Sequence, residues 1–173
     1  TSLIDNYFDC IQKRCKGIPL AYIIEETQFR NNTYHVKKGV LIPRPETELL
    51  VDKTIAYIHK KFGDTPDITI LELGLGTGVI SIELAKIFPT LSLYGWDICK
   101  NAIINTTLNI QKHAITNLEV YHNSFFNDLV RIAYLLTQKP CVVVSNPPYI
   151  DSNTYLTLDP SVLHYEPKQA LDG

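Results

Sequence analysis

The sequence predicts an α/β fold built on a parallel sheet, and three observations carry this prediction. From residue 68 onward, short apolar segments alternate with segments of helical periodicity, as in consecutive βαβ units. A glycine-rich turn, Gly74-Leu-Gly-Thr-Gly78, joins the first apolar segment to the helix after it. The last apolar segment, Cys141–Ser145, is a run of small and β-branched residues, which favours a strand covered on both faces.

Composition narrows the class of protein. The 173 residues are 45% hydrophobic and 20% charged, which is enough for one sizeable core. With a net charge of −2, the chain lacks the excess of basic residues that direct nucleic-acid binding usually needs. No apolar run approaches the roughly 20 residues of a membrane span, and no signal-peptide pattern opens the chain. We therefore expect a cytoplasmic protein that does not bind membranes.

The four cysteines show no CxxC spacing, so neither a disulfide nor a zinc site is expected (Cys10, Cys15, Cys99, Cys141). Cys99 and Cys141 lie in apolar surroundings, which predicts buried free thiols. The chain has no methionine, even at position 1, and we expect it to begin inside a longer gene product.

The first third of the chain predicts two helices and a hairpin. Apolar residues recur at helical spacing over 3–15, and Gly17 and Pro19 end that helix. Residues 27–36 alternate around Asn31-Asn32, which indicates a short β-hairpin. Prolines keep residues 41–45 extended, and a helix follows from residue 46 to about 61. Glu46 and Glu48 lie in its first turn, where ordinary helix-start chemistry accounts for either acid.

The remaining chain predicts four strands separated by three helices. The strands cover residues 68–73, 91–96, 118–122 and 141–145, and the helices 78–88, 100–113 and 127–137. Residues 151–173 are predicted to be loop with one short helix near 159–164.

The glycine turn predicts a ligand site. Alternate glycines allow a tight turn and a close approach of ligand to backbone, and the N–H groups that open the next helix face that ligand. Glu72 precedes the turn, where a carboxylate could face a cationic group. Asp97 ends the second strand, where an acid can bind ribose hydroxyls or cap the next helix.

Two cofactors with an adenosine half suit this pattern, a nicotinamide dinucleotide and S-adenosylmethionine. The spacing G-x-G-x-G is one residue shorter than the dinucleotide fingerprint. S-adenosylmethionine has no pyrophosphate and carries a sulfonium charge, so the spacing and Glu72 favour it. Phe125, after the third strand, could stack on the adenine ring or belong to the core.

The fourth strand leads into Asn146-Pro147-Pro148-Tyr149. Two prolines end the strand ladder because neither has an N–H to donate. Pro147 also holds Asn146 away from helical geometry, at the carboxyl edge of the sheet where α/β proteins bind ligands. An ordinary Pro-Pro loop is the alternative for these four residues alone.

Together, residues 72–78, Asp97 and 146–149 resemble a class I S-adenosylmethionine-dependent methyltransferase that acts on a planar nitrogen. N6-adenine DNA methyltransferases and the glutamine methyltransferases of release factors (the HemK/PrmC family) share Asn-Pro-Pro-Tyr. The second group is also similar to this chain at Gly17-x-Pro-x-x-Tyr-Ile23, Ile42-Pro-Arg-Pro-Glu-Thr-Glu48 and Glu166-Pro-x-x-Ala-Leu-x-Gly173. The resemblance covers residues 16–173.

This resemblance implies a Rossmann-like class I methyltransferase sheet, seven-stranded in the family and here ending after its fourth strand. Residues 1–40 would be the end of an N-terminal helical domain with a linker hairpin, and 41–173 the S-adenosylmethionine-binding domain. The implied cofactor residues are Glu72, Gly74, Leu75, Gly76, Thr77, Gly78, Asp97, Phe125 and Asn146. The implied catalytic residues are Asn146, Pro147 and Tyr149, and Pro148 joins them in binding substrate.

The implied reaction is methylation of the glutamine side-chain nitrogen (N5) in the Gly-Gly-Gln motif of a peptide-chain release factor. The Asn146 Oδ1 and the Pro147 carbonyl would accept the two amide N–H bonds, with no metal. Three positions depart from the family: Ser124 replaces an acid, Phe125 a tryptophan, and Leu75 a small or polar residue. The alternatives are an N6-adenine nucleic-acid methyltransferase and an inactive fragment that only binds cofactor or partner.

Overall fold

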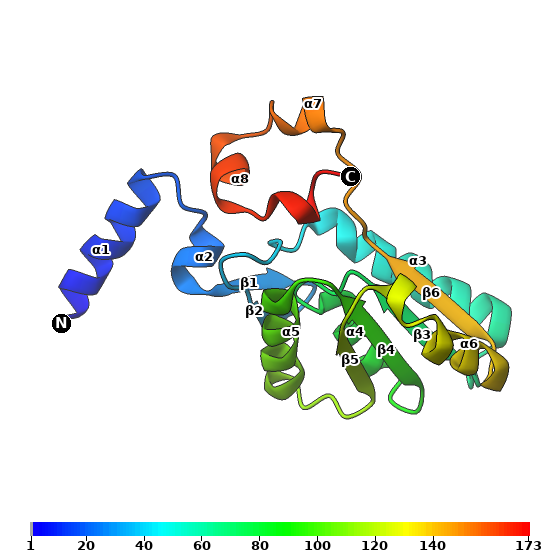
Figure 1. Ribbon diagram of the computed structural model, residues 1–173. Coiled ribbons are helices and arrows are strands. Elements are labelled where there is room, and N and C mark those ends of the chain that lie inside the picture. The colour runs from blue at the N-terminus through cyan, green and yellow to red at the C-terminus, as the bar shows by residue number, and fades with distance from the viewer. Residues whose placement is uncertain (1) are drawn as a thin grey trace.

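A four-stranded parallel sheet forms the centre of the structure, a computed structural model that describes residues 2–173 (Figure 1). Its strands are β3 (Thr69–Leu73), β4 (Ser92–Asp97), β5 (Leu118–His122) and β6 (Cys141–Ser145). They lie in the order β5-β4-β3-β6 and all pair in parallel. The order reverses between β3 and β6, and a ligand crevice in this class of sheet opens at such a reversal.

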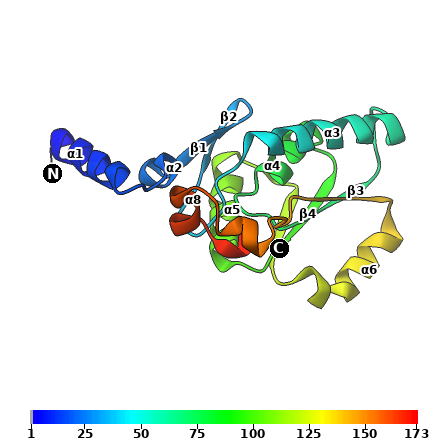
Figure 2. The same cartoon turned by 90° about the horizontal axis from the view of Figure 1, so that it is seen from above.

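Helices cover both faces of the sheet, because each strand alternates its side chains between two apolar clusters. On one face, α3 (Pro45–Phe62), α4 (Val79–Ile87) and α5 (Lys100–Lys112) pack together. The other face carries α6 (Leu129–Gln138), as Figure 2 shows. Ile70 of β3 enters the larger cluster. Its neighbour Leu71 joins Trp96 and two residues of α6 in the smaller one. The predicted α/β fold is confirmed.

Strand β6 is less buried than its sequence predicts. Val142 and Val144 are buried, but Val143 between them is 52% exposed. Within residues 2–173, β6 pairs with β3 alone and forms an edge of the sheet. The expectation of a strand covered on both faces was wrong, since an unbroken apolar run does not show whether another element lies over each face.

The N-terminal part contains α1 (Leu3–Cys15), α2 (Leu20–Ile24) and a hairpin of β1 (Glu26–Phe29) and β2 (Asn32–His35). Helix α1 matches the predicted range and extends away from the sheet in both views (Figures 1 and 2). The hairpin turn lies at Arg30-Asn31, one residue earlier than expected, and Arg30 adopts a φ of 52°. The short helix α2 was not predicted.

The C-terminal segment passes over the carboxyl ends of the strands (Figure 1). It contains α7 (Ser152–Tyr155), α8 (Pro160–Tyr165) and a 3-10 turn, η2 (Lys168–Ala170). The sequence predicted one helix here and missed α7, whose N-cap Asp151 accepts hydrogen bonds from two backbone amides of its first turn.

Two of the cysteines are less buried than the sequence predicts. Cys99 and Cys141 are free thiols, as expected, but each is only partly buried, so the prediction of buried thiols was wrong. Both lie at strand or helix ends, where neighbouring elements leave one side open.

Among the helices of residues 2–173, none is long and apolar enough to cross a membrane.

Candidate functional site

The glycine turn lies between β3 and α4, at the reversal of strand order. Gly74, Gly76 and Gly78 all have positive φ, which glycine adopts without strain. A Cβ added to Gly74 or Gly76 would meet no atom within 4 Å, so the space beside the turn is open. A Cβ on Gly78 would lie 2.6 Å from Thr106 Cγ2, so Gly78 allows α4 to begin against α5.

Leu75 contributes its side chain to packing rather than to the open side of the turn. It is 3% exposed. A Cβ at Gly95 of β4 would meet its Cδ2 at 2.3 Å. A leucine at position 75 therefore fills the room that a glycine in β4 leaves free. This explains a departure from the family pattern, and it leaves the backbone of Leu75 as the part available to a ligand.

Side chains of α5 hold the glycine turn from behind. The Thr106 hydroxyl donates to the Gly76 carbonyl at 3.0 Å, and Asn109 Nδ2 donates to the Thr77 carbonyl at 2.8 Å. Asn109 also bonds both backbone groups of His35, at 2.7 Å to its N–H and 2.9 Å to its carbonyl. One amide thus ties the turn to the hairpin.

Sequence reasoning missed these α5 contacts, although a signal was present. Asn105, Thr106 and Asn109 are buried, and Asn109 lies four and three residues after the first two, so all share one side of the helix. Polar residues at that spacing on the inward face of a helix are unusual, because buried polar groups need hydrogen-bond partners. Such a pattern indicates that the helix supports a loop.

Asp97 lies at the carboxyl end of β4, beside the turn. Its Oδ2 accepts from the Gly76 N–H at 2.9 Å, and its Oδ1 accepts from the Cys99 N–H at 2.8 Å. The N-cap of α5 is Cys99 rather than Asp97. The carboxylate therefore orders both the glycine turn and the chain that leads into α5, and it remains partly exposed.

Glu72 is buried below the same turn, with 1% of its surface exposed. Its Oε2 accepts hydrogen bonds from the N–H of Ser81, at 2.9 Å, and from the Ser81 hydroxyl. Its Oε1 has no hydrogen-bond partner among the described residues. Burial, with a smaller effect of the Asp97 charge, raises the pKa of Glu72 to about 8, although the Ser81 bonds act in the opposite direction. An unpartnered buried oxygen is an acceptor for a ligand N–H.

Phe125 opens a 3-10 turn, η1 (Phe125–Asn127), just after β5. It is partly buried, as is Ser124 before it. Its ring meets that of Trp96 edge-on, with centroids 5.7 Å apart. Phe125 therefore packs against the smaller apolar cluster and keeps part of its surface exposed.

Asn146 follows β6 directly and lies across the strand reversal from the glycine turn. Ser145 pairs with Leu73, and its hydroxyl donates to the Leu73 carbonyl at 2.8 Å. The Asn146 Nδ2 donates to Thr47 Oγ1 of α3 at 3.3 Å. Two segments named by the resemblance, residues 42–48 and 146–149, therefore meet at this side chain.

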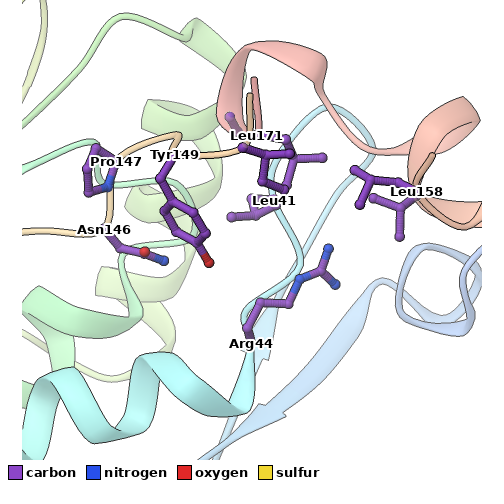
Figure 3. Close-up of a pocket in the computed structure, with 10 residues that line it drawn as sticks. Leu41, Arg44, Asn146, Pro147, Tyr149, Leu158 and Leu171 are labelled. Carbon is purple, nitrogen blue, oxygen red and sulfur yellow. The ribbon is translucent and has the colours of Figure 1, made fainter. Parts of the chain in front are cut away.

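A cavity of about 270 Å³ opens beside Asn146 (Figure 3). Segments far apart in the chain line it, and the labelled side chains of Asn146, Tyr149 and Arg44 border the same space. Pro147 also lines it. Tyr149 is 74% exposed and forms an outer wall rather than a buried one.

The C-terminal segment closes this cavity. The Ile150 N–H donates to the Leu171 carbonyl at 3.0 Å, and the Gly173 N–H donates to the Ile150 carbonyl at 3.1 Å. A Cβ on Gly173 would lie 2.2 Å from the Pro148 carbonyl oxygen, so only a glycine permits this approach. Glu166 of the same segment pairs with Arg44 at 2.5 Å and accepts from the Ile42 N–H at 3.1 Å.

Within residues 2–173 the structure contains no group of three or more histidine, cysteine, aspartate or glutamate side chains arranged to hold a metal ion. The chemistry that the site offers consists of hydrogen-bond acceptors at three strand ends. Those of β3 and β4 surround the glycine turn, and that of β6 borders the cavity.

Comparison with known proteins places the chain in a family. Residues 48–160 match the model of the methyltransferase small domain. The release factor glutamine methyltransferase of Bacillus anthracis is 36% identical over 168 residues, covering 97% of this chain and 57% of that protein. The protein of the same name from Aquifex aeolicus is 35% identical, covering 92% and 54%. The chain thus spans about half the length of these curated relatives.

A solved structure agrees with the fold. The T. thermophilus 16S rRNA N2 G1207 methyltransferase, in complex with AdoMet and guanosine, superimposes with a TM-score of 0.50. The match covers 72% of this chain and 32% of that one at 16% identity, and it bears on the fold alone. The glycine turn at β3, the acid at the end of β4 and the matched residues 48–160 lead to one conclusion: the chain belongs to the methyltransferase small domain family.

Proposed function

We propose that this protein transfers a methyl group from S-adenosylmethionine to the side-chain amide nitrogen of a glutamine in a peptide-chain release factor, within its Gly-Gly-Gln motif. One observation carries the proposal. The Asn146 carboxamide and Pro147 border a cavity of about 270 Å³ at the strand reversal, one strand away from the glycine turn. The two relatives described above are named for release factor glutamine methylation.

The residues around the glycine turn fit S-adenosylmethionine. The open space beside Gly74 and Gly76 admits a ligand against the backbone. The unpartnered Glu72 Oε1 would accept from a ligand ammonium, and the Asp97 carboxylate suits ribose hydroxyls. We assign cofactor contacts to these residues, to the backbone of residues 74–78, to Phe125 and to Asn146. When bound, S-adenosylmethionine supplies an electrophilic methyl group on a sulfonium.

Asn146 and Pro147 act on the acceptor nitrogen. A carboxamide nitrogen is a weak nucleophile because its lone pair is delocalised into the carbonyl. The Asn146 Oδ1 and the Pro147 carbonyl each accept one of its N–H bonds, which orients the nitrogen and favours the positive charge that develops on it. The nitrogen forms the new bond to carbon, the electron pair of the broken bond stays on sulfur, and one amide proton leaves to water. Pro148 and Tyr149 wall the acceptor pocket.

The proposal extends to the domains and the compartment. Residues 41–173 form the cofactor-binding domain, and residues 1–40 are the end of a helical domain with a linker hairpin. Release factors act on ribosomes, so the proposed place of action is the cytoplasm.

Labelled S-adenosylmethionine tests the proposal directly. The chain is incubated with a release factor, with the same factor carrying alanine for the motif glutamine, or with duplex DNA. Label on the unaltered factor alone is the expected result. Label on DNA alone would favour the N6-adenine alternative, and label on none of the three would favour a chain without transfer activity.

A further inference from the structure

Thr47 is a buried hydroxyl residue beside the proposed catalytic amide. It lies in the first turn of α3, is 7% exposed, and accepts a hydrogen bond from Asn146 Nδ2 at 3.3 Å. The two residues are 99 positions apart in the sequence and belong to different motifs. No other side-chain hydrogen bond of Asn146 occurs within residues 2–173. Thr47 is thus the polar partner that this side chain has in the folded chain.

The orientation of the Asn146 carboxamide matters because its two ends have opposite chemistry. Oxygen accepts hydrogen bonds and nitrogen donates them, yet the two are nearly equal in size. A half-turn of this group would exchange them at little steric cost. The proposed reaction needs the oxygen toward the acceptor amide, since a carboxamide N–H there would meet another N–H. Packing alone does not select between these orientations.

We propose that Thr47 is a positioning residue for Asn146. In the structure its oxygen accepts from the Nδ2 end, and this arrangement leaves the Oδ1 end to accept from the substrate amide. The inference rests on the proposed function, and it names a residue that acts through Asn146 without touching the reacting atoms.

The structure fixes Thr47 at the required place. The Thr47 N–H donates to the Arg44 carbonyl at 3.0 Å, and Pro45 starts the helix with a φ suited to it. Arg44, the N-cap of α3, is held by Glu166, which also accepts from the Ile42 N–H. The segment that carries Thr47 is therefore anchored before it bonds Asn146.

Thr54 provides a matched control on the same helix. It is 8% exposed, and its hydroxyl donates to the Leu50 carbonyl at 2.8 Å, within α3. Thr47→Val and Thr54→Val remove one hydroxyl each from equally buried positions. A general effect of valine on α3 would appear in both variants, whereas an effect through Asn146 would appear in the first alone.

The kinetic test uses the chain, labelled S-adenosylmethionine and a release factor. Thr47→Val should lower kcat about tenfold, the effect of losing one hydrogen bond to a group that contacts the substrate, and should change cofactor Kd far less. Thr47→Ser should restore most of the rate, and Thr54→Val should match the unaltered chain. In an Asn146→Ala background, Thr47→Val should cause no further loss. A Thr47→Val rate equal to that of Thr54→Val overturns the proposal.

A second readout does not depend on activity. The side-chain NH₂ resonances of Asn146 are assigned by NMR from their loss in Asn146→Asp. Thr47→Val should shift these resonances, and Thr54→Val should not. If the unaltered chain does not label the release factor, the proposed function is wrong. The shifts of these resonances still show whether Thr47 contacts the Asn146 side chain. Absence of a shift specific to Thr47→Val overturns the positioning role in either case.

Discussion

Arg44 and Glu166 form an ion pair across 122 positions of sequence, with Nη2 2.5 Å from Oε1. The Glu166 side chain is 1% exposed, whereas that of Arg44 is 32% exposed. The pair joins the extended segment before α3 to the C-terminal segment that closes the cavity. Both residues belong to motifs that the sequence identified without assigning them a role.

Replacing Glu166 by alanine should destabilise the protein by about 2 kcal/mol. The change leaves Arg44 and the Ile42 N–H without their partner, and partial exposure of Arg44 keeps the cost below that of a fully buried pair. The matched control is Asp67→Ala, which removes an exposed ion pair to Lys139 with the same 2.5 Å separation. It should cost no more than about 0.5 kcal/mol. Urea unfolding measures both, and equal losses would contradict a structural role for Glu166.

Replacing Asn146 by alanine should lower methyl transfer to a release factor at least about a hundredfold, because one acceptor for the reacting amide is lost. Binding of cofactor, followed by calorimetry, should change far less. Asn153→Ala, at an exposed position of helix α7, serves as the control and should leave both quantities unchanged. Full turnover by Asn146→Ala would remove the basis of the proposed mechanism.

Replacing Asp97 by asparagine should act on cofactor affinity. The variant keeps an oxygen for one of the two backbone amides but loses the charge that strengthens bonds to hydroxyl groups. We expect Kd for S-adenosylmethionine to rise roughly tenfold or more. Turnover at saturating cofactor should change less. Asp64→Asn, at a 98% exposed side chain, should bind like the unaltered chain. Unchanged affinity in Asp97→Asn would place the ribose elsewhere.

Glu72 should make stability depend on pH. Burial raises its folded pKa to about 8 from an ordinary 4.5, so between these values the folded chain holds a proton that the unfolded chain has lost. Its contribution therefore weakens the fold as pH rises through that window. Glu72→Gln stays neutral, and its stability relative to the unaltered chain should grow with pH, by at most about 1.4 kcal/mol per unit. Urea unfolding at several pH values between 5 and 8.5 tests this, and a constant difference would indicate an ordinary pKa.

The strands and helices of the sheet could be predicted because their signals are local. Apolar periodicity located β3 to β6 to within about a residue, and glycine and proline marked their ends. The exposure of Val143 in β6 could not be predicted, since it depends on which elements lie over that face of the strand. Helix α7 was missed because it is four residues long and starts from a single capping aspartate.

The site could be predicted in outline but not in its connections. Motif residues Glu72, Asp97 and Asn146 do lie at adjacent strand ends, as strand order requires. The contacts between motifs depend on tertiary structure. Glu48 illustrates the limit, because its place in a first helical turn suggested only helix-start chemistry. In the structure its Oε1 accepts from the Arg30 N–H at 2.7 Å, which fixes the hairpin turn to α3.

The Asn109 side-chain amide bonds the backbone of both His35 and Thr77, and this limits which residues can replace it. Its nitrogen donates to the carbonyls of His35 and Thr77 while its oxygen accepts from the His35 N–H. Aspartate has the same shape but no N–H to donate, and glutamine has the same groups on a chain one methylene longer. Leucine would fill the space but leave the His35 N–H and the Thr77 carbonyl without this partner, while the His35 carbonyl would keep its bond from Asn105. A library of substitutions here should therefore accept almost nothing, although the residue lies behind the turn and away from its open side.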